Sequence, residues 1–224
     1  SLMPIYNQMS LLEVVLKRIV KTNNVDKVIL ATSNNNLDDP LEEVARGCNV
    51  EFFRGKENDV LSRFVEINKT YRSEAVIRTC ADNPFLDSSM IENLVDFFWS
   101  NQPCDYSMNL GPVTGFLDST GAEIISRNSL DRLSKEVTTN HDKEHVLTYI
   151  HNNPTFITKN MIAPPKFRRP NYRIDIDFPE DMEFVRKLID KLPKSTAPFW
   201  TTEEIITTLD SNVNLLDIRK KREE

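Results

Sequence analysis

The chain has 224 residues, a formal net charge of −6 and three cysteines. Its length allows a large buried core, and its acidic balance argues against a nucleic acid partner, which would require a clustered basic surface. The sequence has no apolar run as long as a membrane span, no signal-peptide pattern and no Cys-x-x-Cys pair. We therefore expect a cytoplasmic protein with reduced thiols and no membrane partner.

Strand-like and helical patterns alternate over the first hundred residues, which is typical of βα units with a mostly parallel sheet flanked by helices. Ser10 and Glu13 have the spacing of a capping box and precede an apolar face at helical spacing. Asp39 and Pro40 have the residue types of an N-cap and a first helical position. We predict strands at 28–31, 50–53 and 75–78, and further helices at 59–68 and around 90–98.

The pattern loosens after residue 105. Strands are predicted at 106–110, 123–126 and 172–176, with a loop at 111–121 between the first two. Helices are predicted at 129–137, 144–152 and 179–190, and a last one begins near Thr201, where Thr201 and Glu204 repeat the capping-box spacing. Residues 219–224 are predicted to form a charged tail. No repeat or linker divides the chain, so we expect one domain over residues 1–224, with an elaborated section at 105–170.

Two acidic turns follow strand-like runs that lie far apart in the sequence. Asp82 lies four residues past Arg78, and Asp175 and Asp177 lie where the predicted strand 172–176 ends. Ligands of α/β sheets bind beyond the carboxyl ends of the strands, where such loops gather. Magnesium prefers oxygen ligands and usually takes only one or two carboxylates. The sequence therefore predicts a magnesium site formed by Asp82 and Asp177, assisted by Asp175.

Helix capping is the alternative interpretation of Asp177. The residue precedes Pro179 as an N-cap would, and the acidic residues at 180 and 181 favour a helix N-terminus electrostatically. For Asp177 alone, capping and metal binding both stay open. Asp82 is harder to interpret as a cap, because Asp87 and the serines at 88 and 89 are available to the next helix.

Four segments, taken in order along the chain, resemble a known family. Residues 78–87, Arg-Thr-Cys-Ala-Asp-Asn-Pro-Phe-Leu-Asp, resemble the Ala-Asp-x-Pro-x-x-Asp signature of cytidylyltransferase-like proteins. Residues 53–61 resemble their Phe-Arg-Gly-x-x-x-Asp-Val-Leu segment, residues 143–154 their Glu-His-Val-Thr-x-Tyr-Ile segment, and residues 175–179 their second metal motif. Within this family, the chain most resembles the spore-coat polysaccharide biosynthesis type, which is related to acylneuraminate and KDO cytidylyltransferases. The resemblance covers nearly the whole chain.

The resemblance implies a Rossmann-like nucleotidyltransferase fold. It also implies transfer of a nucleotidyl group from CTP to a sugar or sugar acid, with release of pyrophosphate. Asp82 and Asp177 would be the catalytic residues that hold Mg²⁺, with Asp175 beside them. In such an in-line displacement, positioning and charge neutralisation supply most of the catalysis.

The resemblance places Thr32, Ser33 and Arg78 near the nucleotide. Turn chemistry is the alternative for Thr32 and Ser33, since they precede three asparagines, and it is the interpretation we favour for Ser33. For Arg78 we favour a functional role, because an unpaired guanidinium at the end of an apolar strand would be costly to bury.

Glu123, Glu144 and His145 are the candidates for contacts with the sugar. The resemblance implies that section 105–170 shapes the sugar pocket and the contacts of a homodimer. A lone histidine is more often structural than catalytic, so that alternative stays open for His145.

The chain departs from the family pattern at its start. Family members begin with a buried strand and a loop rich in Gly, Arg and Ser that wraps the triphosphate, whereas residues 1–5 match the stretch after that loop. Residues 7–9, Asn-Gln-Met, replace a Gly-Lys-Pro found in relatives. We expect that the fold lacks its first strand because residues ahead of residue 1 are missing from this sequence. The alternative is that the protein is a catalytically silent relative. The loss of a central strand should expose the edges and apolar faces of its neighbours.

Two other functions stay open. A metal-dependent glycosyltransferase could use the Asp-x-Asp pattern of Asp175 and Asp177 to hold a nucleotide-sugar. A non-catalytic scaffold of a polysaccharide pathway is the second. Release of pyrophosphate from CTP would distinguish the nucleotidyltransferase from a glycosyltransferase. Thermal stabilisation by CTP would distinguish it from a scaffold.

Overall fold

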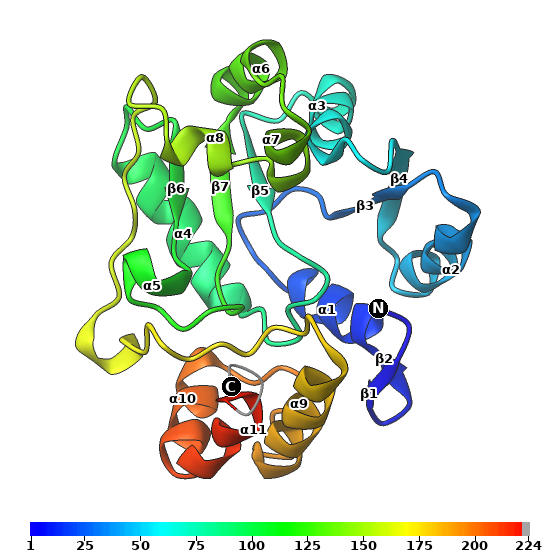
Figure 1. The fold of residues 1–224 in the computed structure, drawn as a ribbon, viewed down its shortest axis with the longest axis vertical. Helices are drawn as coiled ribbons and strands as arrows, with labels where there is room; N and C mark the ends of the chain where they lie inside the picture. The colour runs from blue at the N-terminus through cyan, green and yellow to red at the C-terminus, as the bar shows by residue number, and fades with distance from the viewer. Residues whose placement is uncertain (221–224) are drawn as a thin grey trace.

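The computed structural model describes residues 1–220, in which strands and helices alternate along the chain (Figure 1). The first half contains β1 (Pro4–Tyr6), β2 (Met9–Ser10), α1 (Leu11–Ile19), β3 (Ile29–Ser33), α2 (Asp39–Gly47), β4 (Glu51–Gly55), α3 (Val60–Tyr71), β5 (Ala75–Arg78) and α4 (Ser88–Ser100). The second half contains β6 (Tyr106–Met108), α5 (Gly111–Thr114), β7 (Glu123–Ser126), α6 (Arg127–Glu136), α7 (Asn140–His145), α8 (Thr148–His151), α9 (Pro179–Lys191), α10 (Thr202–Asp210) and α11 (Asp217–Lys220).

The strands form two principal sheets and one small hairpin. β3 pairs with β4 in parallel, whereas β7 lies between β5 and β6 and runs antiparallel to both. β1 and β2 form the hairpin that precedes α1. The predicted α/β class is confirmed, and β7 is the strand that departs from parallel order.

β7 carries apolar side chains on both of its faces, because neighbouring side chains of a strand point to opposite sides. Ile124 belongs to the same cluster as Leu94 and Phe98 of α4. Ile125 belongs to the opposite cluster, with Leu130 of α6 and residues of α3. Helices therefore cover both faces of the three-stranded sheet, and Figure 1 shows α4 running along it.

Arg18 of α1 joins three segments of the chain. Its guanidinium donates hydrogen bonds to the carbonyl oxygens of Leu86 (2.7 Å), Phe85 (3.2 Å), Trp200 (2.6 Å) and Pro198. The side chain is 2% exposed, and burial lowers its pKa to about 10. These bonds hold α1 against the segments that lead into α4 and α10.

The helix starts follow the sequence closely. The hydroxyl of Ser10 accepts from the backbone N–H of Glu13, and Thr201 forms the predicted capping box with Glu204. The prediction of Asp39 as the N-cap of α2 is wrong by one position, since the N-cap is Asp38 and Asp39 is the first residue of the helix. In the predicted tail, 219 and 220 belong to α11, and 221–224 lie outside the described residues.

The predicted strand at 172–176 is wrong. The backbone N–H of Asp118 donates to the Tyr172 carbonyl (2.8 Å), and the N–H of Ile176 donates to the Asp82 carbonyl (3.0 Å). The Arg219 side chain donates to two more carbonyl oxygens of the segment, both at 2.9 Å. The segment is extended but forms no ladder, because its backbone bonds to two loops and a side chain.

The predicted helix at 144–152 is also wrong, since α7 and α8 are two short helices. Val146 between them has φ 44°, which a right-handed helix does not allow. The break lets Val146 and Leu147 both enter the core that α3 and α6 share, where each is 1% exposed. The predicted loop at 111–121 contains the four-residue α5.

A cavity of about 850 Å³ lies between β3 and β5 and is bounded by α1, α3 and α4. Within residues 1–220 no ladder joins the sheet of β3 to the sheet of β5. All four residues of β5 are only partly buried, although β6 in the same sheet is fully buried. The edges of β3 and β5 that face this cavity have no strand partner among the described residues.

The helices of residues 1–220 include none that is both long and apolar enough to cross a membrane. In the same residues, Cys48, Cys80 and Cys104 are free thiols, as the absence of a paired cysteine motif predicts.

Candidate functional site

The two acidic turns come together in space. The hydrogen bond from the Ile176 N–H to the Asp82 carbonyl joins the turn after β5 to the segment that leads into α9. Asp175 and Asp177 flank this bond on the segment that leads into α9, and Asp82 lies on the turn after β5. The structure thus brings together the three carboxylates that the sequence proposed as metal ligands.

Asp82 is the carboxylate with the least compensation. Burial raises its pKa, and the negative charges of Asp177 and Asp175 raise it further. A hydrogen bond to its own backbone and the charge of Arg78 oppose this rise but do not cancel it. The surroundings of Asp82 therefore favour the arrival of positive charge.

Arginines hold the other two carboxylates. Arg173 lies 2.7 Å from Asp175 and 3.0 Å from Asp177, and Arg219 lies 3.2 Å from Asp175. Burial alone would raise the pKa of Asp175, but Arg173 and Arg219 bring it below its ordinary value. Burial and the neighbouring Asp175 raise the pKa of Asp177. Asp175 is therefore paired with two arginines, whereas Asp177 shares only Arg173.

The capping alternative for Asp177 is wrong. The N-cap of α9 is Phe178, and the carboxylate of Asp181 accepts from the N–H groups of Phe178 (2.9 Å) and Asp177 (3.0 Å). Asp181 is completely buried and pairs with Arg219 at 3.1 Å. The side chain of Asp177 is left available for a role beyond the helix start.

Asp118 is a member of the cluster that the sequence analysis missed. Burial raises its pKa, and the negative charge of Asp175 adds to the rise. Its backbone N–H binds the Tyr172 carbonyl, which brings the loop between α5 and β7 beside the acidic segment. No motif marks Asp118 in the sequence, because it lies in an irregular loop whose position depends on the fold.

The carboxylates present fit a magnesium ion with few protein ligands. Residues 1–220 hold no group of three or more His, Cys, Asp or Glu side chains placed to ligate one metal. Magnesium usually takes one or two carboxylates and keeps water or phosphate oxygens for its other positions. The carboxylates of Asp82 and Asp177 suit such a site, although Arg173 also pairs with Asp177 at 3.0 Å. Asp175 pairs with both Arg173 and Arg219. Which of the three would hold the metal stays a prediction.

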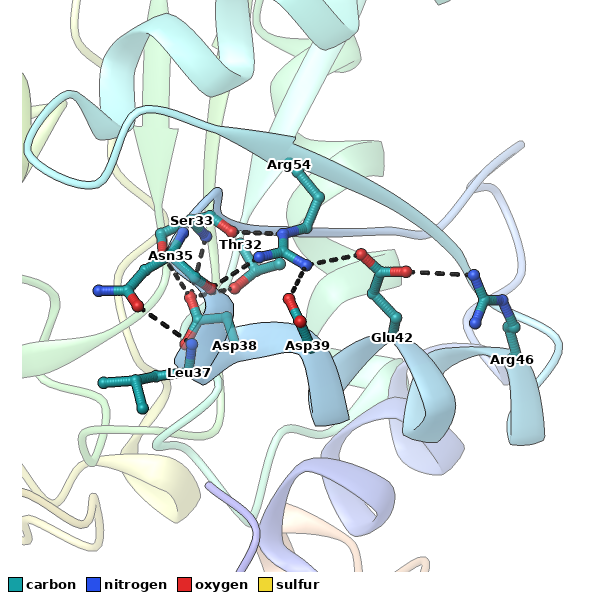
Figure 2. Close-up of polar contacts among 9 residues, drawn as sticks. All are labelled: Thr32, Ser33, Asn35, Leu37, Asp38, Asp39, Glu42, Arg46 and Arg54. Carbon is teal, nitrogen blue, oxygen red and sulfur yellow. Dashed lines mark hydrogen bonds and ion pairs between the residues drawn. The ribbon is translucent and has the colours of Figure 1, made fainter.

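Thr32 and Ser33 lie at the carboxyl end of β3, where Figure 2 shows them around Asp38. Both hydroxyls donate to the carboxylate of Asp38, at 2.7 and 2.6 Å, and the Ser33 N–H donates to it at 3.1 Å. Arg54 of β4 lies 2.7 Å from Asp39 and from Glu42, and donates to the Ser33 carbonyl. These contacts support turn chemistry for both hydroxyls, and contact with a nucleotide stays a prediction.

We expect Asp38→Asn to lower the free energy of unfolding by about 2 kcal/mol at pH 7, because it weakens charge-assisted hydrogen bonds. Burial alone would raise the pKa of Asp38, but the bonds from Ser33 and Thr32 and the charge of Arg54 lower it. This contribution is present above the unfolded pKa and is lost as pH falls from about 4 through the folded pKa. The difference in the free energy of unfolding between Asp38→Asn and the parent chain should therefore be smaller at low pH.

Urea denaturation at pH 7 and pH 3 measures that gap. The exposed Asp131→Asn serves as the control and should change stability little at either pH. A loss for Asp38→Asn that is equal at both pH values would contradict the role of its ionised form.

Arg78 and Glu123 form an ion pair across the sheet. They are register partners in β5 and β7, and a guanidinium nitrogen of Arg78 lies 2.6 Å from the Glu123 carboxylate. The hydroxyl of Tyr106 donates to the other oxygen at 2.6 Å and lies 3.3 Å from His151. Burial raises the pKa of Tyr106, and Glu123 adds to the rise. The partly buried guanidinium of Arg78 thus has a carboxylate partner, and contact of Arg78 with a nucleotide and of Glu123 with a sugar both stay predictions.

Glu144 and His145 are exposed at the end of α7, which packs on α3. Near them a polar cavity of about 330 Å³ lies between α7 and the loops after β3 and β4. Its lining includes two lysines and three amides; the residues are Asn34, Lys56, Glu57, Asn58, Asp59, Asn140 and Lys143. The sequence analysis named none of these as a site, although 56–59 lie inside the Phe-Arg-Gly-x-x-x-Asp-Val-Leu resemblance. Glu144 and His145 are not among the lining residues.

Comparison with known proteins gives matches over most of the chain. A family model described as cytidylyltransferase matches residues 3–205. The spore coat polysaccharide biosynthesis protein SpsF of Bacillus subtilis is 32% identical, over 84% of this chain and 76% of its own length. An uncharacterised protein of Methanocaldococcus jannaschii is 27% identical, over 95% of this chain and 88% of its own.

Solved structures agree with these matches. A cytidylyltransferase from Leptospira borgpetersenii has a TM-score of 0.84 and 25% identity, over 94% of this chain and 87% of its own. CMP:2-keto-3-deoxy-manno-octonic acid synthetase, solved with CTP, shares the fold at a TM-score of 0.59 and 14% identity, over 84% of this chain and 91% of its own. The fold is the predicted α/β nucleotidyltransferase fold. The chain is a nucleotidyltransferase and belongs to the cytidylyltransferase family.

Proposed function

We propose that this chain transfers a cytidylyl group from CTP to a sugar or sugar acid for surface polysaccharide biosynthesis, with release of pyrophosphate. Family membership and the similarity to SpsF support the type of reaction and of pathway. The observation that carries the proposal is the meeting of Asp82 and Asp177 from distant turns, with charge left over for a cation. A homodimer and a cytoplasmic location belong to the same proposal.

In this proposal Asp82 and Asp177 hold Mg²⁺, and Asp175 positions Arg173 and Arg219. When bound, Mg²⁺ neutralises charge on the triphosphate and makes its α-phosphorus easier to attack by a sugar oxygen. Arg173 is half exposed beside Asp177, so its guanidinium can reach a phosphate that lies on the same cation. The carboxylates orient the reacting groups rather than form a covalent bond with them.

A metal-dependent glycosyltransferase fits the geometry less well. Such an enzyme would use Asp175 and Asp177 together on one cation. Arg173 and Arg219 already pair with Asp175, and these two contacts lower its pKa. A non-catalytic scaffold has no observation in its favour beyond those that the enzyme also explains.

Pyrophosphate release tests the function. The chain is incubated with Mg²⁺, a panel of sugars and sugar acids, and each of CTP, UTP, ATP and GTP in turn. Pyrophosphate that appears with CTP and depends on one acceptor supports the proposal. Transfer from a preformed nucleotide-sugar without pyrophosphate would favour the glycosyltransferase. No thermal shift with any of the four nucleotides would favour the scaffold.

A further inference from the structure

The segment at residues 173–177 carries two of the three candidate metal ligands, Asp175 and Asp177, but it belongs to no sheet. One backbone hydrogen bond, from the Ile176 N–H to the Asp82 carbonyl, ties it to the turn after β5. A functional carboxylate must be held to within about 0.5 Å of its productive position, and side chains on loops are placed less precisely than those on strands or helices. Something other than a ladder must therefore fix the position of Asp177.

Arg219 of α11 reaches this segment from a distant part of the chain. Nη1 of its guanidinium donates to the carbonyl oxygens of Arg173 and Asp175, both at 2.9 Å. Nη2 lies 3.2 Å from the Asp175 carboxylate, and Nε lies 3.1 Å from the carboxylate of Asp181 in the first turn of α9. Every nitrogen of the guanidinium thus faces an oxygen of the segment or of the helix that follows it.

Asp181 extends this constraint to Asp177. One oxygen of the Asp181 carboxylate lies near Arg219, and the other accepts from the backbone N–H groups of Asp177 at 3.0 Å and Phe178 at 2.9 Å. Asp181 is completely buried, so its carboxylate cannot turn without leaving charged and polar groups unpaired inside the protein. Arg219 therefore restrains the backbone at Asp175 directly and at Asp177 through Asp181.

The guanidinium of Arg219 is itself held by the packing of α11. Its central carbon lies 5.7 Å from the ring centre of Phe184 in α9, which is fully buried. Leu216 and Ile218 pack against the same core cluster as Phe184, and Figure 1 shows α11 beside α9. The Arg219 side chain is 12% exposed, whereas that of Arg173 is 50% exposed. Arg219 is thus placed to hold the segment, and Arg173 is the arginine that is open to a ligand.

We propose that Arg219 is a positioning residue of the candidate site: it fixes the backbone at 173–177 and so places the Asp177 carboxylate opposite Asp82, without contact with metal or nucleotide. This inference rests on the proposed function, and it extends the site beyond residue 205, where the match to the cytidylyltransferase model ends. Lysine cannot take the role, because it presents a point charge where arginine presents a planar fork that meets several oxygens at once.

Amide hydrogen exchange tests the positioning without any ligand. In the parent chain the N–H groups of Ile176 and Asp177 bond to Asp82 and Asp181, so both should exchange slowly. Arg219→Ala should speed exchange at these two positions by at least about tenfold and leave exchange in β7 unchanged. The matched control is Arg186→Ala, which removes a 2.8 Å bond from an exposed arginine of α9 to a backbone carbonyl of β1.

Mn²⁺ binding and transfer test the consequence for the site. Arg219→Ala should lower both Mn²⁺ affinity and kcat, each by about 10- to 100-fold, the usual cost of losing a group that orients a metal ligand. Electron paramagnetic resonance of Mn²⁺ with CTP measures the affinity, and pyrophosphate release measures the rate. KM for CTP should change little, because no contact with the nucleotide is removed. Arg186→Ala should change none of these quantities.

Two further arms separate positioning from general support of the fold. Free guanidinium at millimolar concentration should restore part of the rate to Arg219→Ala and none to Arg186→Ala. Arg219→Lys keeps the charge but should remain impaired in Mn²⁺ affinity and kcat. If Arg219→Ala does not fold, Arg219→Lys serves for the comparisons of exchange, affinity and rate.

Unchanged exchange at Ile176 and Asp177 in the Arg219 variants would overturn the proposal. Faster exchange with unchanged Mn²⁺ affinity and kcat would overturn it as well, since Arg219 would then only support the fold. Failure of the proposed function looks different, because the parent chain itself would neither bind Mn²⁺ with CTP nor release pyrophosphate. The catalytic part of the inference would then fall with that function, and exchange would still decide whether Arg219 holds the segment.

Discussion

Asp82→Asn is expected to reduce nucleotidyl transfer by about 100- to 1,000-fold, the scale seen when one electrostatic contact to a reacting group is removed. Asparagine keeps the size of the side chain but removes the charge that would hold a cation. The loss should appear in Mn²⁺ binding as well as in the rate, and electron paramagnetic resonance of Mn²⁺ measures the binding directly. The exposed Asp131→Asn is the matched control and should change neither quantity.

The same substitution should stabilise the protein in the absence of metal. Burial and the charges of Asp177 and Asp175 raise the folded pKa of Asp82 above its unfolded value. A carboxyl group with a raised folded pKa costs stability once pH is high enough to ionise it, and costs none below the unfolded pKa. Asp82→Asn should therefore raise Tm at pH 7 and leave it unchanged near pH 3. Lower Tm at pH 7, with unchanged Mn²⁺ binding, would assign Asp82 a structural role.

Arg18→Met is expected to lower the free energy of unfolding by about 3–5 kcal/mol, the largest effect we predict on stability. The substitution removes donors from the carbonyls of Phe85, Leu86, Pro198 and Trp200. A buried acceptor that loses its partner costs about 1–3 kcal/mol, and methionine recovers part of the sum through its apolar surface. Urea denaturation with a linear extrapolation measures the change.

Arg46→Met is the matched control for Arg18→Met. Arg46 is exposed and forms an i,i+4 pair with Glu42 at 3.1 Å. Exposed pairs of this kind contribute about 0–1 kcal/mol. Comparable losses for the two variants would show that the four carbonyl contacts of Arg18 contribute little.

The sequence predicts several helix starts and strands well, because their signals are local. Ser10 with Glu13 and Thr201 with Glu204 satisfy backbone donors within one turn, so no distant contact is needed to place them. The strands at 75–78 and 123–126 lie where apolar runs predict them. The segment 172–176 has the same local pattern, but its partners are the loops at Asp82 and Asp118, which no local pattern describes.

The candidate site is predictable to a similar degree. Asp82 and Asp177 follow recognisable turns, and the fold brings them together as the sequence predicts. The neighbouring charged residues that shift the pKa values of these carboxylates or pair with them are not predictable from local patterns. Asp118 and Arg219 reach the cluster from an irregular loop and from the last helix described, so their roles depend on how distant segments pack.

Arg173 gives the acidic cluster an internal counter-ion. It lies within 3.0 Å of both Asp175 and Asp177, so part of the negative charge is balanced before any metal arrives. On the proposed function, free Mg²⁺ must compete with this guanidinium for Asp177 and gains little by binding alone. A triphosphate bound together with the metal would give the Arg173 guanidinium another anion to pair with in place of Asp177. Binding of the metal and binding of the nucleotide would then be one coupled event, and the enzyme would not hold a cation between turnovers.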